Sequence, residues 1–146
     1  MPPSSHALSQ SAQGELDRLL QSGLKAAEAE LVRVAEFVPF VHTIDAEGRM
    51  LAAGFDLSGL GKHPEPEAVI AHVTAALRAA RDQLRAVAIV MNSTLQSPRI
   101  DVIEQRLEHV EGASLTVLTR YKRPKFGGAL EYGETRSYAK PAEVFG

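Results

Sequence analysis

The sequence contains no cysteine. Disulfide bonds, thiolate metal sites and a cysteine nucleophile are therefore excluded. Any chemistry must come from histidine, carboxylate, hydroxyl or basic side chains.

Long hydrophobic runs are also missing. No stretch approaches the roughly 20 apolar residues of a membrane-spanning helix. The start, MPPSSHALSQ, has neither the basic region nor the apolar core of a signal peptide. The net charge is −2, so no overall positive field attracts nucleic acid or an anionic membrane. We therefore expect a cytoplasmic protein without nucleic-acid or membrane partners.

Recognisable catalytic and cofactor motifs are absent as well. None of the five histidines has HExxH or His-x-His spacing. The glycines match neither a phosphate-binding P-loop nor the dinucleotide fingerprint, and no serine lies in a nucleophile elbow. We expect no metal and no cofactor, and an enzyme is the least favoured class of function, with His42, Asp101 and His109 as the residues that would carry its chemistry.

What the sequence does contain is the composition of one globular domain. Its 146 residues are 45% hydrophobic and 23% charged, which is enough for a single core. Residues 1–10 are rich in Pro, Ser and Gln and are expected to form a flexible tail. The predicted domain covers residues 11–146.

A β-hairpin is predicted at the centre of the chain. Residues 100–110 alternate with a period of two, and residues 115–121 are rich in β-branched side chains. Glu111-Gly112 lies between them, and glycine tolerates the positive φ of a tight turn.

The preceding segments predict two helices and three further strands. The first helix would run from an N-cap at Ser11 to about Phe37, with a kink or break at Gly23. The second would begin at Pro66. Strands are expected at 38–45, 49–55 and 87–91, the last covered on both faces because it is continuously apolar. The predicted buried stripe of the first helix consists of Leu16, Leu20, Leu24, Ala27, Leu31 and Val34.

This order, α-ββ-α-βββ, predicts an α+β fold. We expect an antiparallel sheet of about five strands with both helices on one face. The glycine-rich stretch after Pro124 gives no clear prediction.

The order of elements resembles the profilin-like and roadblock-like folds over residues 12–123. The resemblance implies dimerisation, as in roadblock-like proteins, or small-molecule binding, as in profilin-like sensor domains. The chain also resembles small bacterial α+β families that have no assigned activity. Because the resemblance lies in topology, it assigns no functional residue.

A polar cluster of His42, Asp101 and His109 is one candidate site. The two histidines would meet if their strands paired, with Asp45 or Asp101 nearby. The alternative is that each is a partly buried strand histidine bonded to a backbone carbonyl. The carboxylates of the central hairpin are interpreted as a solvated face. These carboxylates are Asp101, Glu104, Glu108 and Glu111.

A basic and aromatic cluster is the second candidate. Its ligand-binding residues would be Arg120, Tyr121, Lys122, Arg123 and Lys125. The site would lie between the 54–66 loop, the strand end at 120–125 and the loop at 127–133, and it could hold a phosphate or stack a base. The alternative is a positively charged strand end that protects the sheet edge from aggregation.

These observations favour a small, soluble, non-catalytic domain that acts through protein association as a homodimer. The alternatives are a small-molecule or anion-binding module and an immunity-type inhibitor of a partner protein.

Overall fold

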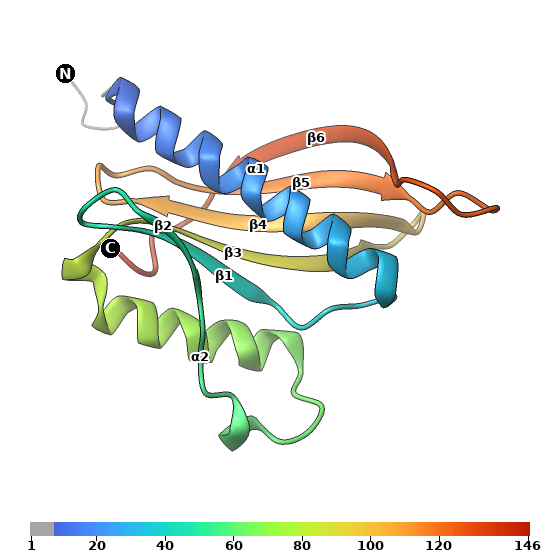
Figure 1. The fold of residues 1–146 in the computed structure, drawn as a ribbon, viewed down its shortest axis with the longest axis horizontal. Coiled ribbons are helices and arrows are strands. Elements are labelled where there is room, and N and C mark those ends of the chain that lie inside the picture. The colour runs from blue at the N-terminus through green and yellow to red at the C-terminus, as the bar shows by residue number, and fades with distance from the viewer. Residues whose placement is uncertain (1–7) are drawn as a thin grey trace.

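The computed structural model describes residues 8–146. Most of the predicted flexible tail, residues 1–10, lies outside the described residues. Two helices and six strands form the fold (Figure 1). In chain order they are α1 (Gln10–Arg33), β1 (Phe40–Asp45), β2 (Met50–Ala53), α2 (Pro66–Ala79), β3 (Leu84–Leu95), β4 (Ile100–His109), β5 (Ser114–Lys122) and β6 (Glu131–Ala139).

Helix α1 begins two residues earlier than predicted and ends earlier too. Its N-cap is Ser9 rather than Ser11, and the Ser9 hydroxyl accepts a hydrogen bond from the Ala12 N–H at 3.1 Å. Ser9 also donates through its N–H and its hydroxyl to the Glu111 carboxylate, at 3.0 and 2.7 Å. A partner 102 residues away thus decides between two serines that are equally good caps locally.

Gly23 lies within an unbroken helix, so the predicted kink is wrong. A Cβ at this position would overlap the side-chain oxygen of Gln105. Gln105 is fully buried and donates from Nε2 to the Leu20 carbonyl at 3.1 Å. Gly23 therefore lets α1 approach the sheet closely.

The buried row of α1 is rotated relative to the predicted stripe. Leu19 and Leu31 are fully buried, whereas Leu16, Leu20 and Leu24 flank the core and are only partly buried. The complete buried row is Ala12, Glu15, Leu19, Gly23, Ala27 and Leu31. Three small residues, Ala12, Gly23 and Ala27, and the paired carboxylate of Glu15 belong to this row, and a search for large apolar side chains does not find them.

The six strands form one antiparallel sheet in the order β2-β1-β3-β4-β5-β6. The predicted central hairpin is confirmed as β4 and β5, and Gly112 in its turn has φ of 112°. Strand β6 is the additional strand and was not predicted. It is exposed along its whole length, so it carries no apolar signal.

The helices cover opposite faces of the sheet, which corrects the prediction that both cover one face (Figure 1). Alternate residues of β3 contact different helices: Ala88 packs beneath α1, and Ile89 packs against the α2 side. The continuous apolar run at 87–91 is thereby explained, because β3 is buried on both faces, as predicted.

The start of α2 follows the sequence prediction. Pro66 occupies the first turn, where its missing N–H costs no hydrogen bond. Glu67 in the first turn and Arg78 in the last turn complement the helix dipole. Val69, Val73 and Leu77 bury its inner face.

Candidate functional site

The exposed edge at β6 is the largest strand surface that the described residues leave open. All nine of its residues are exposed, and within residues 8–146 β6 pairs with β5 alone. The opposite edge, β2, is only four residues long. In the middle of β6, Arg136 Nε lies 2.9 Å from Glu134 Oε1, and both side chains are more than half exposed.

The sheet face beside this edge is also partly open. Helix α2 packs over β1 and β3, and on the same face β3 to β6 surround a shallow hollow of about 140 Å³. Leu95 and Tyr138 at this hollow are 41% and 49% exposed. Its polar lining comes from Arg120, Glu134 and Arg136. Apolar and paired charged groups therefore lie together next to β6.

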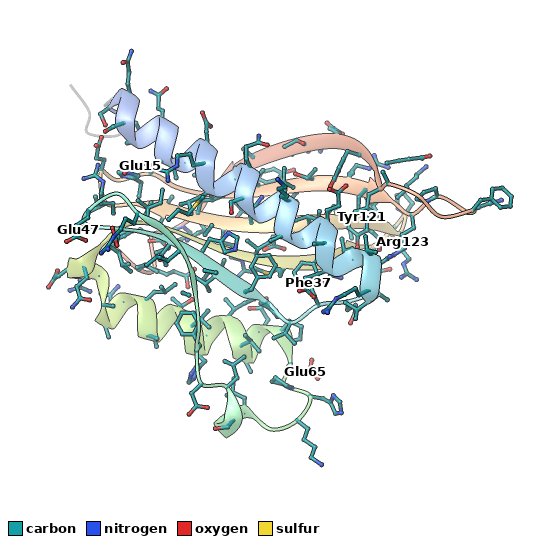
Figure 2. All side chains as sticks on the ribbon, viewed as in Figure 1. Glu15, Phe37, Glu47, Glu65, Tyr121 and Arg123 are labelled. Carbon is teal, nitrogen blue, oxygen red and sulfur yellow. The ribbon has the colours of Figure 1, made fainter. Side chains whose placement is uncertain are left out.

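The predicted basic cluster is divided by the structure. Arg120, Lys122 and Lys125 are exposed, but Tyr121 is buried beneath α1, and burial raises the pKa of its hydroxyl. Arg123 donates to the Leu31 and Val34 carbonyls at the C-terminal end of α1. Figure 2 shows Tyr121 and Arg123 near this end of the helix. Arg123 thus holds the end of a helix, whereas Arg120, Tyr121 and Lys122 together line a hollow of about 340 Å³.

The 54–66 loop lies apart from the other two segments of the predicted ligand site. The 54–66 loop follows β2 at one edge of the sheet, and residues 120–133 lie on β5 and β6 at the other edge. Strands β1, β3 and β4 separate them, an order that the sequence did not indicate.

The predicted cluster of His42, Asp101 and His109 is also not brought together. Strand β3 lies between β1, which carries His42, and β4, which carries the other two. Asp101 is near the start of β4, where it accepts a hydrogen bond from Thr94, and His109 is at the end of that strand. The alternative, a partly buried histidine bonded to a backbone carbonyl, is not found either. His42 Nδ1 lies 2.9 Å from the Ser22 hydroxyl, and His109 is fully buried and bonds to Glu15.

His109 belongs instead to a buried ion-pair network that sequence analysis did not identify. Its Nδ1 accepts from the Glu111 N–H at 3.0 Å, so Nε2 carries the proton and donates to Glu15 at 2.9 Å. Arg85 donates to both oxygens of the same carboxylate. The Arg85 hydrogen bond, more than any other contact, holds the pKa of Glu15 below its usual range. The network fastens the N-terminal half of α1 to β3 and β4; Glu15 is labelled in Figure 2.

The hairpin carboxylates were predicted to form a solvated face, and the burial of Glu108 shows that this prediction is wrong for that residue. It is 3% exposed and accepts hydrogen bonds from the backbone N–H groups of Glu143, Val144 and Phe145. Lys140 Nζ lies 2.8 Å from the same carboxylate. Glu108 therefore clamps the C-terminal segment onto the sheet, and Val144 enters the core on the α2 side.

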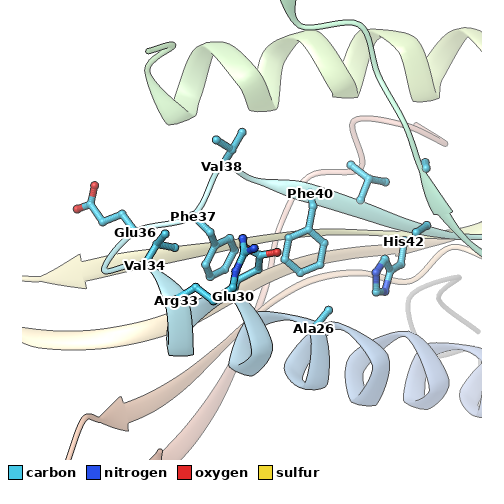
Figure 3. A pocket seen from close by; sticks show the side chains of 12 residues that line it. Ala26, Glu30, Arg33, Val34, Glu36, Phe37, Val38, Phe40 and His42 are labelled. Atoms are coloured by element: carbon cyan, nitrogen blue, oxygen red, sulfur yellow. The ribbon is translucent and has the colours of Figure 1, made fainter. Parts of the chain in front are cut away.

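A cleft of about 510 Å³ lies where α1 leaves β2 uncovered (Figure 3). One wall is a row of rings: the Phe37 and Phe40 centroids are 5.4 Å apart, and those of Phe40 and His42 are 5.3 Å apart. Ala26 and Ala52 also line the cleft, and their short side chains leave it open. The sequence signal for this cleft is limited to aromatic residues two or three positions apart.

Comparisons with known proteins identify no relative. No family model, no curated protein and no solved structure matches the chain. The resemblance to the profilin-like and roadblock-like folds therefore stays a prediction. Within residues 8–146, no helix is long and apolar enough to cross a membrane. In the same part of the chain, no three metal-ligating side chains are grouped to hold an ion.

Proposed function

We propose that the protein acts through association with a second copy of itself, by antiparallel pairing of two β6 strands. The observation that carries the proposal is the open nine-residue edge at β6. A long strand with free N–H and C=O groups is a template for another strand. Pairing would continue the sheet across a two-fold axis, the commonest symmetry of soluble homodimers.

The charges on β6 support pairing with itself. In an antiparallel pair centred on Thr135, position 134 of one strand lies opposite position 136 of the other. Glu134 would then face Arg136 of the second copy twice, once on each side of the axis. Opposite charges directly across two strands stabilise the pair, and like charges destabilise it.

The hollow beside the edge also supports pairing of two copies through β6. Leu95 on β3, Leu118 on β5 and Tyr138 on β6 line this hollow, and a second copy paired at β6 would shield part of their apolar area. Homodimer interfaces combine an apolar centre with a polar rim. The two components, an edge and an adjacent apolar patch, are continuous here.

Charge exchange on β6 tests the proposal with light scattering. We expect the unchanged protein to show twice the 15.8 kDa mass of the chain. Glu134→Arg and Arg136→Glu, made singly, should each give monomers, because both place like charges opposite each other. The double variant should dimerise again. Mixing the two single variants should give a heterodimer, since each supplies the charge that the other lacks.

Asp82→Arg is the control, because it reverses an exposed charge far from β6 in sequence and should leave the dimer intact. Monomeric unchanged protein across micromolar concentrations would contradict self-association. Single variants that remain dimeric would reject the β6 interface.

A further inference from the structure

The cleft between α1 and β2 has features that the proposed dimer does not use. It lies beside β2, at the opposite edge of the sheet from β6. Its volume of about 510 Å³ falls within the roughly 300–1,000 Å³ of small-molecule sites. Its lining is mostly apolar, and its polar groups come from His42, Glu30, Arg33 and Glu36.

The row of aromatic rings determines which ligand shapes fit the cleft. Adjacent rings are tilted by 39° between Phe37 and Phe40 and by 47° between Phe40 and His42. Rings at such distances and angles interact favourably with a further ring placed beside them. In the β1–β2 pairing, Ala52 lies directly opposite His42, so the two side chains share the face that lines the cleft. A flat molecule fits this space better than a branched one.

His42 provides one hydrogen-bonding group in the lining of the cleft. Its Nδ1 is 2.9 Å from the Ser22 hydroxyl, which fixes the ring and leaves Nε2 for another partner. Burial lowers the pKa of His42, so the ring is uncharged at neutral pH. A neutral imidazole offers one donor or one acceptor at that nitrogen, depending on the tautomer.

The cleft is also lined by charges of both signs. Arg33 and Glu30 form an ion pair at 3.0 Å, and Glu36 adds a further carboxylate. Figure 3 shows Arg33 and Glu30 beside the rings, with Glu36 directed away from them. Among the described residues that line the cleft, Arg33 is the only cation and is already paired with Glu30, so the site does not favour an anion.

From these observations we infer that the cleft binds a small, flat, uncharged aromatic molecule that bears one hydrogen-bonding group, such as an indole or a phenol. The aromatic body contacts Phe37 and Phe40, and its polar group bonds to His42 Nε2. This site is independent of β6, so its test succeeds or fails separately from that of the dimer.

Indole is a suitable probe because the chain contains no tryptophan, so indole fluorescence is free of a protein tryptophan signal. We expect saturable binding of indole to the unchanged protein. Ala52→Leu should weaken it at least tenfold by filling the cleft. His42→Phe should weaken it by roughly tenfold, because it keeps the ring but removes the hydrogen bond. Indole-3-carboxylate should bind less tightly than indole.

The matched control is Ala71→Leu, which adds the same side chain at an exposed position of α2 and should leave binding unchanged. Circular dichroism confirms that each variant is folded. Binding that does not saturate, or that survives Ala52→Leu, would reject the cleft as the site. Tighter binding of indole-3-carboxylate would reject the inferred ligand class in favour of an anion.

Discussion

The half of the sheet formed by β1 and β3 and the half formed by β5 and β6 are covered very differently. Helices on both faces bury β3, whereas β6 is exposed along all nine residues. Two glutamates illustrate the contrast: Glu108, on the central strand β4, is buried beneath the C-terminal segment, and Glu134 lies exposed beside Arg136. Glutamates on the strands of one sheet are therefore enclosed by bonding partners near its centre and remain exposed at its β6 edge.

The largest loss of stability is expected from Glu108→Ala. The substitution leaves three backbone N–H groups and Lys140 Nζ without their acceptor. Breaking a buried charged pair typically costs about 3–5 kcal/mol. Urea unfolding measures this difference, and Glu131→Ala on exposed β6 provides the comparison. Equal effects of the two variants would show that the C-terminal clamp contributes nothing.

Replacing either of two glycines in α1 by alanine should change the stability of the protein, in opposite directions at the two positions. Gly23→Ala should destabilise the protein by about 1–3 kcal/mol, because the methyl group meets Gln105 and Val90 in a packed core. Gly14→Ala meets nothing within 4 Å and should stabilise the helix by about 1 kcal/mol. Thermal unfolding of both variants measures the difference. Stabilisation by Gly23→Ala would contradict the close approach of α1 to the sheet.

Acid should weaken the attachment of α1 through Glu15. Its folded pKa lies below the ordinary value of 4.5, mainly because Arg85 bonds to the carboxylate. The resulting stability is fully present above the unfolded pKa and is lost as the pH falls through the folded pKa. Urea midpoints measured from pH 7 down to pH 3 should therefore fall more steeply for the unchanged protein than for Glu15→Gln. Parallel curves for the two proteins would exclude this contribution.

The smallest effect on stability is expected at Glu134 and Arg136. Both side chains are exposed on β6, where an isolated ion pair contributes little. Under conditions that keep the protein monomeric, the single charge reversals should leave the thermal midpoint unchanged. A marked loss of stability in the monomer would mean that dissociation of the variants reflects unfolding rather than a lost interface.

The sequence predicted those elements whose signals are local. The β4–β5 hairpin follows from strand alternation and Gly112, and the start of α2 follows from Pro66. Strand β6 could not be predicted, because a strand exposed on both sides has no hydrophobic period. The placement of the helices on opposite faces depends on strand order, which only the apolar run at 87–91 hinted at.

The candidate sites were less predictable because they depend on distant partners. Arg123 looked available for a ligand, but it bonds to carbonyls at the end of α1. Glu108 looked solvated because its neighbours alternate in charge, yet its partners lie more than 30 residues away. The aromatic cleft depends on the point where α1 leaves the sheet, and no spacing in the chain encodes that point.

The contact between Gly23 and Gln105 has an evolutionary consequence. The Gln105 side chain fills the space that a side chain at position 23 would need. Gln105 also bonds to the backbone of α1 at Leu20. Related sequences should therefore change positions 23 and 105 together, with a larger residue in the helix accompanied by a shorter one on β4. These two positions should form a covarying pair, although 82 positions of sequence, the difference between 105 and 23, separate them.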